Sequence, residues 1–240
     1  MAASLLYDTE KPCPVCEKTF TVTKVRSRLV TLRQDSDFCT YYKDINPYYY
    51  DIWVCPHCGY AAPENWFASL PPTGREKVRA FLGGRQVNVN FAGERTREQA
   101  IAAFKLAIFY AGLVEADHSR QGGLYLKLAW LYREAGEAAS EQAALKKALE
   151  HYEQALFRER LPIGNMSEIT LMYLVGELAR RTGDYDKALS YFGRLVSDPR
   201  AKLEKRVLEL AREAWHEARE AKKGQAEATS QVEELSREQL

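Results

Sequence analysis

This 240-residue chain lacks a long hydrophobic run, and that absence bears on where the protein works. No stretch approaches the ~20 uninterrupted apolar residues that a membrane span needs. The first twelve residues have neither a basic start nor a long apolar segment, so we expect no secretory signal and no membrane partner. Cysteines in a chain without an export signal should stay reduced, and we therefore expect a cytoplasmic protein.

The chain also lacks an excess of charge and the motifs of common enzyme sites. Lys and Arg number 34 against 33 Asp and Glu, so the strong basic field of many nucleic-acid binders is missing. We find no phosphate-binding glycine loop, no Gly-x-Ser-x-Gly turn and no His-Glu-x-x-His helix. His118, His151 and His216 are scattered without metal-ligand spacing. We expect a non-catalytic protein, since an enzyme would need residues that only folding brings together.

Four of the five cysteines form two Cys-x-x-Cys pairs near the start of the chain. The pairs are Cys13 with Cys16 and Cys55 with Cys58. Two such turns supply the four thiolates of a closed tetrahedral zinc site, so we expect structural Zn²⁺ bound by these residues. Iron in the same sulfur cage is the main alternative, and a dithiol redox pair is less favoured. A small β-rich module buries too little apolar surface to fold alone, so the metal would supply folding energy.

Two residues near these pairs need separate interpretations. His57 lies inside the second pair, and we expect a solvent-facing turn residue because four thiolates already complete the shell. Cys39 is the fifth cysteine, and a buried small hydrophobic residue is the simplest interpretation. The alternative for Cys39 is a reactive thiol or a substitute ligand.

The predicted fold class is α+β, mainly α. We expect a zinc-ribbon-like module over residues 1–62, with strands around Phe20 and Val22, around Val30 and Leu32, and from Tyr48 to Val54. Proline and glycine residues predict a linker over 63–95, with a short helix from about Arg75 to Leu82. Residues 96–223 read as antiparallel helices, and residues 224–240 as a polar tail that is frayed or disordered.

The helical region has an internal repeat. Thr96 and Gln99 form a capping box at its start, and Gly183 is expected to end a helix. Small and aromatic residues recur at the same spacing in three places, as in Ala188, Phe192 and Leu195. This pattern resembles tetratricopeptide repeats, whose helix pairs need small residues at set positions. The alternative is a generic helical bundle.

Motifs along nearly the whole chain resemble a known family. They are Leu5-Leu6-Tyr7-Asp8, Cys13-Pro14-Val15-Cys16, Val25-Arg26-Ser27, Asp35-x-Asp37-Phe38, Asn46-Pro47-x-Tyr49-Tyr50 and Val54-Cys55-Pro56-His57-Cys58-Gly59-Tyr60-Ala61. Together they resemble the bacterial domain-of-unknown-function family 2225. The resemblance implies a bacterial cytoplasmic protein and assigns no activity. It also places Cys39 in a segment similar to the family's own, which favours a position near the metal.

The leading functional hypothesis is an interaction or scaffold protein. Stacked helix pairs form a concave groove, and arginine and aromatic residues are common anchors there. By repeat register, the residues facing this groove are Leu126, Trp130, Arg133, Tyr173, Glu177, Arg180 and Arg181. We expect a protein or peptide partner with an acidic segment or a terminal carboxylate, the alternative being solvated surface charges. Exposed helix faces can also pair with a second copy of the chain, giving a homo-oligomer.

The second functional hypothesis is nucleic-acid binding. Lys24, Arg26 and Arg28 alternate along one predicted strand and share a face. A dense run of tyrosines with Trp53 follows, and exposed aromatics stack on bases. We favour a small aromatic core over this interpretation, because basic and acidic residues are balanced in the module.

Overall fold

The computed structural model describes residues 5–85, 87 and 89–237, and the chain divides into two compact units, residues 1–148 and 149–240. The predicted boundaries at residues 62 and 95 both fall inside the first unit. The segments at 47–50, 52–54 and 61–63 pack on the helix at 97–113, which explains why β-rich and helical segments form one unit. Among the described residues, no helix has both the length and the apolarity to cross a membrane.

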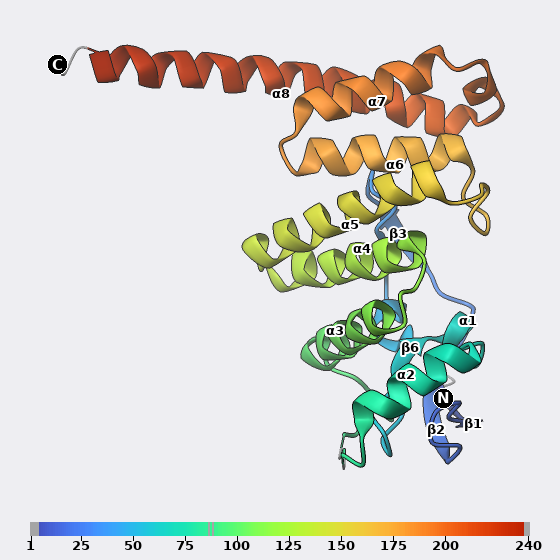
Figure 1. Ribbon diagram of the computed structural model, residues 1–240. Helices are drawn as coiled ribbons and strands as arrows, with labels where there is room; N and C mark the ends of the chain where they lie inside the picture. The colour runs from blue at the N-terminus through green and yellow to red at the C-terminus, as the bar shows by residue number, and fades with distance from the viewer. Residues whose placement is uncertain (1–4, 86, 88, 238–240) are drawn as a thin grey trace. The chain divides into compact units, whose positions relative to one another are not determined.

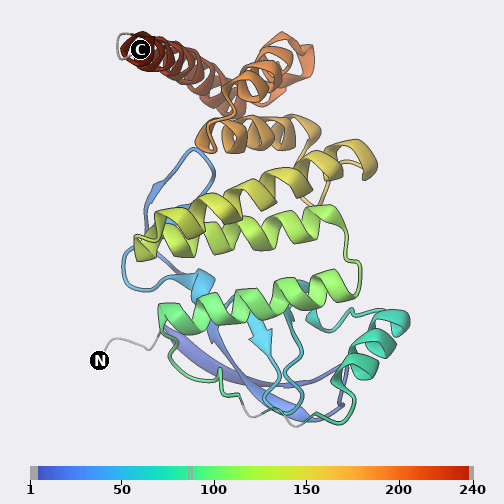
Figure 2. The ribbon, with the colours of Figure 1, turned by 60° about the vertical axis from the view of Figure 1, so that its left-hand side comes forward.

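The β-rich part consists of three two-stranded antiparallel hairpins (Figure 2). The long one pairs β1 (Leu6–Pro12) with β2 (Thr19–Val25). The others pair β3 (Thr31–Gln34) with β4 (Thr40–Tyr42), and β5 (Ile52–Val54) with β6 (Ala61–Pro63).

The predicted strand from Tyr48 to Val54 needs correction. Only Ile52–Val54 is extended, and the preceding η1 (Pro47–Tyr50) is a 3-10 helix. Pro47 sits at its first turn, and the Asn46 side chain accepts a hydrogen bond from the Tyr48 amide. Both features favour a helical start, so the local cap overrides the strand preference of three successive tyrosines.

Four helices complete the first unit, before a fifth that crosses the division. They are α1 (Glu64–Phe67), α2 (Pro72–Leu82), α3 (Arg97–Leu113) and α4 (His118–Ala135), followed by α5 (Ala138–Arg158). The predicted capping box is confirmed, because Thr96 and Gln99 exchange hydrogen bonds at the start of α3. α2 begins three residues before the predicted start, since proline is well suited to the first helical position.

The second unit is built from α6 (Glu168–Arg181), α7 (Tyr185–Ser197), the 3-10 helix η2 (Pro199–Leu203) and α8 (Lys205–Arg237) (Figure 1). Ser167 caps α6. Gly183 has the positive φ of a helix-ending residue, as predicted. α6 packs on α7, and α7 packs on α8. A β-carbon added at Gly176 would lie only 2.7 Å from the Phe192 ring. This helix pair therefore needs glycine at position 176.

α8 continues through residues 224–237, where the sequence predicts a frayed or disordered tail. This stretch contains several glutamate, glutamine and alanine residues, which have high helix propensity. Just before it, Lys223 pairs with Glu220 one turn earlier, at 2.8 Å. The remaining residues of the predicted tail, 238–240, lie outside the described residues.

Candidate metal centre

The two Cys-x-x-Cys pairs lie in equivalent turns of two different hairpins. Cys13 and Cys16 occupy the turn between β1 and β2, and Cys55 and Cys58 occupy the turn between β5 and β6. In each turn the residue after the second cysteine donates its amide to the carbonyl of the first, at 2.9 and 2.8 Å. That residue has a positive φ in both turns, 65° at Glu17 and 76° at Gly59.

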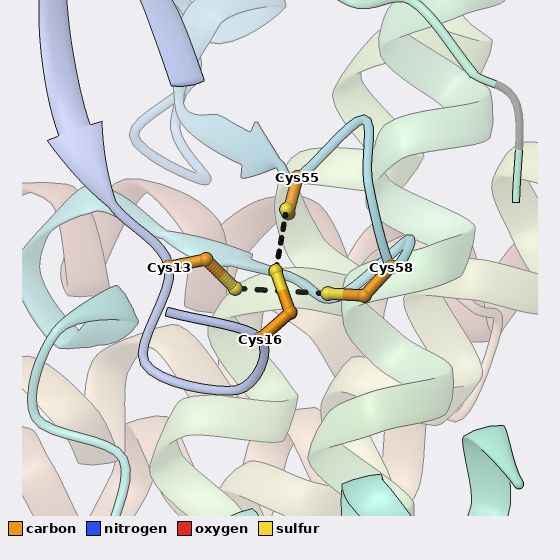
Figure 3. Close-up of side chains that lie close together, drawn as sticks. All are labelled: Cys13, Cys16, Cys55 and Cys58. Carbon is orange, nitrogen blue, oxygen red and sulfur yellow. Dashed lines mark hydrogen bonds between the residues drawn. The ribbon is translucent and has the colours of Figure 1, made fainter. Parts of the chain in front are cut away.

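The two turns bring their four sulfur atoms together (Figure 3). Cys13 Sγ lies 3.6 Å from Cys58 Sγ, and Cys16 Sγ lies 3.7 Å from Cys55 Sγ. All four sulfurs lie within 4.8 Å of one another. A tetrahedral ion about 2.3 Å from each sulfur needs neighbouring sulfurs about 3.8 Å apart. The cluster therefore has the dimensions of a four-thiolate metal site.

The surroundings favour bound metal over disulfides. None of the five cysteines is in a disulfide, and three of the four cluster cysteines are buried, with Cys16 half-buried. Hydrogen bonds from Cys13 and Cys58 lower the pKa of the Cys55 thiol, while the bond to Cys13 raises the pKa of Cys58. The sulfurs are thus too close for four thiolates to coexist unless a cation neutralises them.

Arg79 of α2 holds the first turn from outside. Its Nε donates to the Val15 carbonyl at 2.7 Å, and its Nη2 donates to the Glu17 carboxylate at 2.8 Å. The sequence carries no signal for this role, because Arg79 lies 64 residues after Val15 and 62 residues after Glu17. His57 is exposed, with Nε2 3.3 Å from the Thr19 carbonyl oxygen, which confirms the predicted turn position outside the sulfur shell.

Cys39 is not part of the four-sulfur cluster. Its side chain is buried, as the simplest interpretation predicts, and burial raises the pKa of its thiol to about 12. A thiol with such a pKa stays protonated at neutral pH, which argues against a reactive nucleophile.

The predicted groove residues of the first unit are buried, so this part of the groove hypothesis needs correction. Leu126 is buried, and Trp130 is 8% exposed with its Nε1 donating to Asp37 at 3.1 Å. Arg133 donates to Asp35, Asp37 and Glu141 at 2.6–3.2 Å. These side chains anchor the β3–β4 hairpin to α4. Helix periodicity could not foresee this, because Asp35 and Asp37 come from a hairpin 98 and 96 residues earlier.

The predicted groove residues of the second unit are also not free to face a partner. Tyr173 and Glu177 are both 0% exposed. Arg180 and Arg181 are half-buried and bond the Glu177 carboxylate at 2.7–2.8 Å. Because α6 is buried on every face over most of its length, its periodic pattern did not reveal which side meets solvent.

The basic residues of the nucleic-acid hypothesis do not form one exposed strand face. β2 ends at Val25, so only Lys24 lies in the strand, and it pairs with Glu64 at 2.5 Å. Arg26 packs over the Tyr7 ring at 5.3 Å, and Arg28 is exposed. The aromatic run that follows is buried or half-buried, as the small-core interpretation predicts.

The fold and the site define a mainly helical protein that carries a four-cysteine cluster able to hold a metal ion. A family model described as "Uncharacterized protein conserved in bacteria (DUF2225)" matches residues 6–218. The chain therefore belongs to this bacterial family, in agreement with the motifs quoted above. Neither the curated proteins nor the solved structures give a match.

Proposed function

We propose that this protein is a non-catalytic interaction protein in which one structural Zn²⁺ stabilises the β-rich module. The four-sulfur cluster carries the proposal. Zinc favours tetrahedral thiolate ligation, and the sulfurs at 3.6 and 3.7 Å match the required spacing. Cys13, Cys16, Cys55 and Cys58 would be the ligands, and the ion would join two hairpins that share no strand pairing.

A closed shell supports a structural rather than a catalytic ion. Catalytic zinc keeps a position open for water or substrate, whereas four protein thiolates fill every position. Three of the four cysteines are buried, which shields the ion from solvent. The metal would therefore contribute folding free energy to the module.

For the second unit we propose the helix pairing of a tetratricopeptide-like array. α6 and α7 are joined by three residues, which makes them antiparallel neighbours. Gly176 of α6 faces the Phe192 ring of α7, so the small residue lets the two helices approach closely. Helix pairs of this kind present extended surfaces for protein partners.

Exposed apolar side chains in the second unit support a protein partner. Leu203 is 87% exposed in η2, and Trp215 is 40% exposed on α8. Tryptophan is enriched among residues that dominate binding energy. These residues replace the buried ones of the predicted groove as the positions to test, because substituting them leaves the core intact.

Capture of tagged full-length protein from bacterial lysate, with and without nuclease, tests this proposal. We expect a protein partner that survives nuclease and is lost in the double variant Leu203→Ser with Trp215→Ser. Glu213→Ser is the matched control, since it is exposed on the same helix and should retain the partner.

The nucleic-acid alternative gives a different result. Its partners should disappear with nuclease and with Arg26→Glu plus Arg28→Glu, and binding should weaken steeply with salt. Capture of no protein in either arm would contradict the interaction role.

A further inference from the structure

A cavity of about 160 Å³ lies in the first unit, and none of the four cluster cysteines lines it. Its walls come from β6, α1, the α1–α2 connection, the end of α3 and the start of α4. These elements pack together, with β6 against both α1 and α3 (Figure 1). No role in the proposed metal site requires this space.

The walls of the cavity are mainly apolar. Small and aliphatic residues line most of it: Ala61, Ala62, Leu70, Ala107, Ala111 and Val114. Tyr60, Trp66 and Tyr110 add aromatic surface. An apolar protein cavity of about 150 Å³ is large enough to bind benzene. The space is therefore large enough for a single ring.

The charged groups at the rim are paired. Arg120 lies 3.5 Å from the Asp117 carboxylate, and Lys77 lies 2.9 Å from the Glu115 carboxylate. Arg120 also stacks over the Trp66 ring at 5.2 Å. Since these charges cancel within the protein, a charged ligand would lose hydration without gaining an unpaired opposite charge. The rim thus favours an uncharged ligand.

One polar group in the wall is the Tyr60 hydroxyl. Tyr60 lines the cavity and is buried, and its ring is held against Phe67 and Tyr110. A tyrosine hydroxyl can donate to, or accept from, a hydrogen-bonding group on a ligand. An apolar space with one orienting polar group is typical of small-molecule sites.

We propose that this cavity binds an uncharged monocyclic aromatic compound, with its ring between β6 and α3 and one polar substituent hydrogen-bonded to the Tyr60 hydroxyl. The inference is independent of the partner-binding role proposed for the second unit. The proposed ligand would occupy a region of the first unit that lies outside the metal site.

Calorimetric titration of the metal-loaded full chain with phenol and with toluene tests this proposal. Both should bind saturably, with phenol tighter. Tyr60→Phe should weaken phenol roughly three- to tenfold, the range for one hydrogen bond, and should leave toluene within about twofold. Benzoate and benzylamine, which carry charge, should bind more weakly than phenol.

A cavity-filling variant provides the second arm. Ala111→Leu should abolish binding of both probes without lowering the melting temperature, because the new side chain occupies empty space. Ala102→Leu is the matched control, an exposed position on the same helix. If Ala111→Leu fails to fold, Ala62→Val serves instead. Absence of saturable binding, binding unaffected by these variants, or tighter binding of benzoate would overturn the proposal.

Discussion

The two units of this protein hold themselves together in different ways. The β-rich part of the first unit has three two-stranded hairpins, and an isolated hairpin of this size is at best marginally stable in water. Distant residues join these pieces through four sulfurs and a buried ion-pair network. The second unit consists of consecutive helices that pack on their neighbours. Long-range links therefore stabilise one unit, and local packing stabilises the other.

The two buried carboxylates of the units show the same contrast. Asp37 and Glu177 are both 0% exposed, and each bonds to arginine. The partner of Asp37 is Arg133, 96 residues away in sequence, whereas the partners of Glu177 lie three and four residues further along α6. Breaking the first pair should detach a hairpin from a helix, and breaking the second should perturb only one helix.

The largest predicted effect comes from removing the metal. Chelator with reductant, or Cys55→Ser, should unfold the β-rich module, since structural zinc contributes about 10–16 kcal/mol in zinc-finger peptides. Hydrogen exchange read by mass spectrometry should show lost protection in β5 and β6 and retained protection in α7. Cys39→Ser is the control and should keep both metal and protection. Equal loss of protection in both units would contradict the claim that the metal stabilises only the first unit.

Removing the arginine of the long-range pair should have the next largest effect. Arg133→Met leaves Asp37 buried without its cation, which costs about 3–5 kcal/mol for a buried pair. Chemical denaturation measures the change in unfolding free energy. Arg33→Met is the control, because Arg33 is exposed and its half-buried partner Asp35 keeps the hydrogen bond from Arg133, so the expected loss is about 0–1 kcal/mol. Similar losses in both variants would contradict the assigned role of Arg133.

Two glycines test the local packing of the second unit. Gly176→Ala places a methyl group against the Phe192 ring, and overpacking of this kind costs about 1–3 kcal/mol. Within the described residues, nothing lies within 4 Å of a β-carbon at Gly193, so Gly193→Ala should stabilise α7 by up to about 1 kcal/mol. Thermal denaturation should therefore shift in opposite directions, and the same direction for both would refute tight packing of α6 on α7.

The smallest predicted effect compares the two cysteine turns. Glu17 holds a left-handed conformation that costs non-glycine residues about 1–2 kcal/mol. Glu17→Gly relieves this cost but loses the exposed ion pair with Arg79, which is worth about 0–1 kcal/mol, so we expect a net stabilisation of the metal-loaded protein of up to about 1 kcal/mol. Gly59→Ala should destabilise it by a similar amount, because Gly59 has the same conformation and an added β-carbon would lie 3.1 Å from Val87. Melting temperatures of the two variants measure this difference.

Local signals predicted much of this structure. The capping box at Thr96 and the Gly183 helix end are features of a few adjacent residues, and both were found. The four cysteines were also predictable as one group, because Cys-x-x-Cys spacing is specific for metal ligation. In each case the chemistry is contained in the short segment itself.

The errors came from contacts between distant segments. Trp130 and Arg133 have the residue types of a binding groove, yet Asp37 of a remote hairpin buries them. Helix periodicity identified α6 but not the burial of both its faces, so Tyr173 and Glu177 were misplaced. Arg79 and the cavity beside Tyr60 likewise depend on the packing of separate elements, which a single sequence does not display.

X-ray absorption at the zinc edge, with metal quantification of the purified protein, shows whether the four cysteines hold a structural zinc. We expect one zinc per chain, with four sulfur neighbours at about 2.3 Å and no oxygen or nitrogen ligand. A fully folded protein without metal, or a shell containing fewer than four sulfurs, would contradict it.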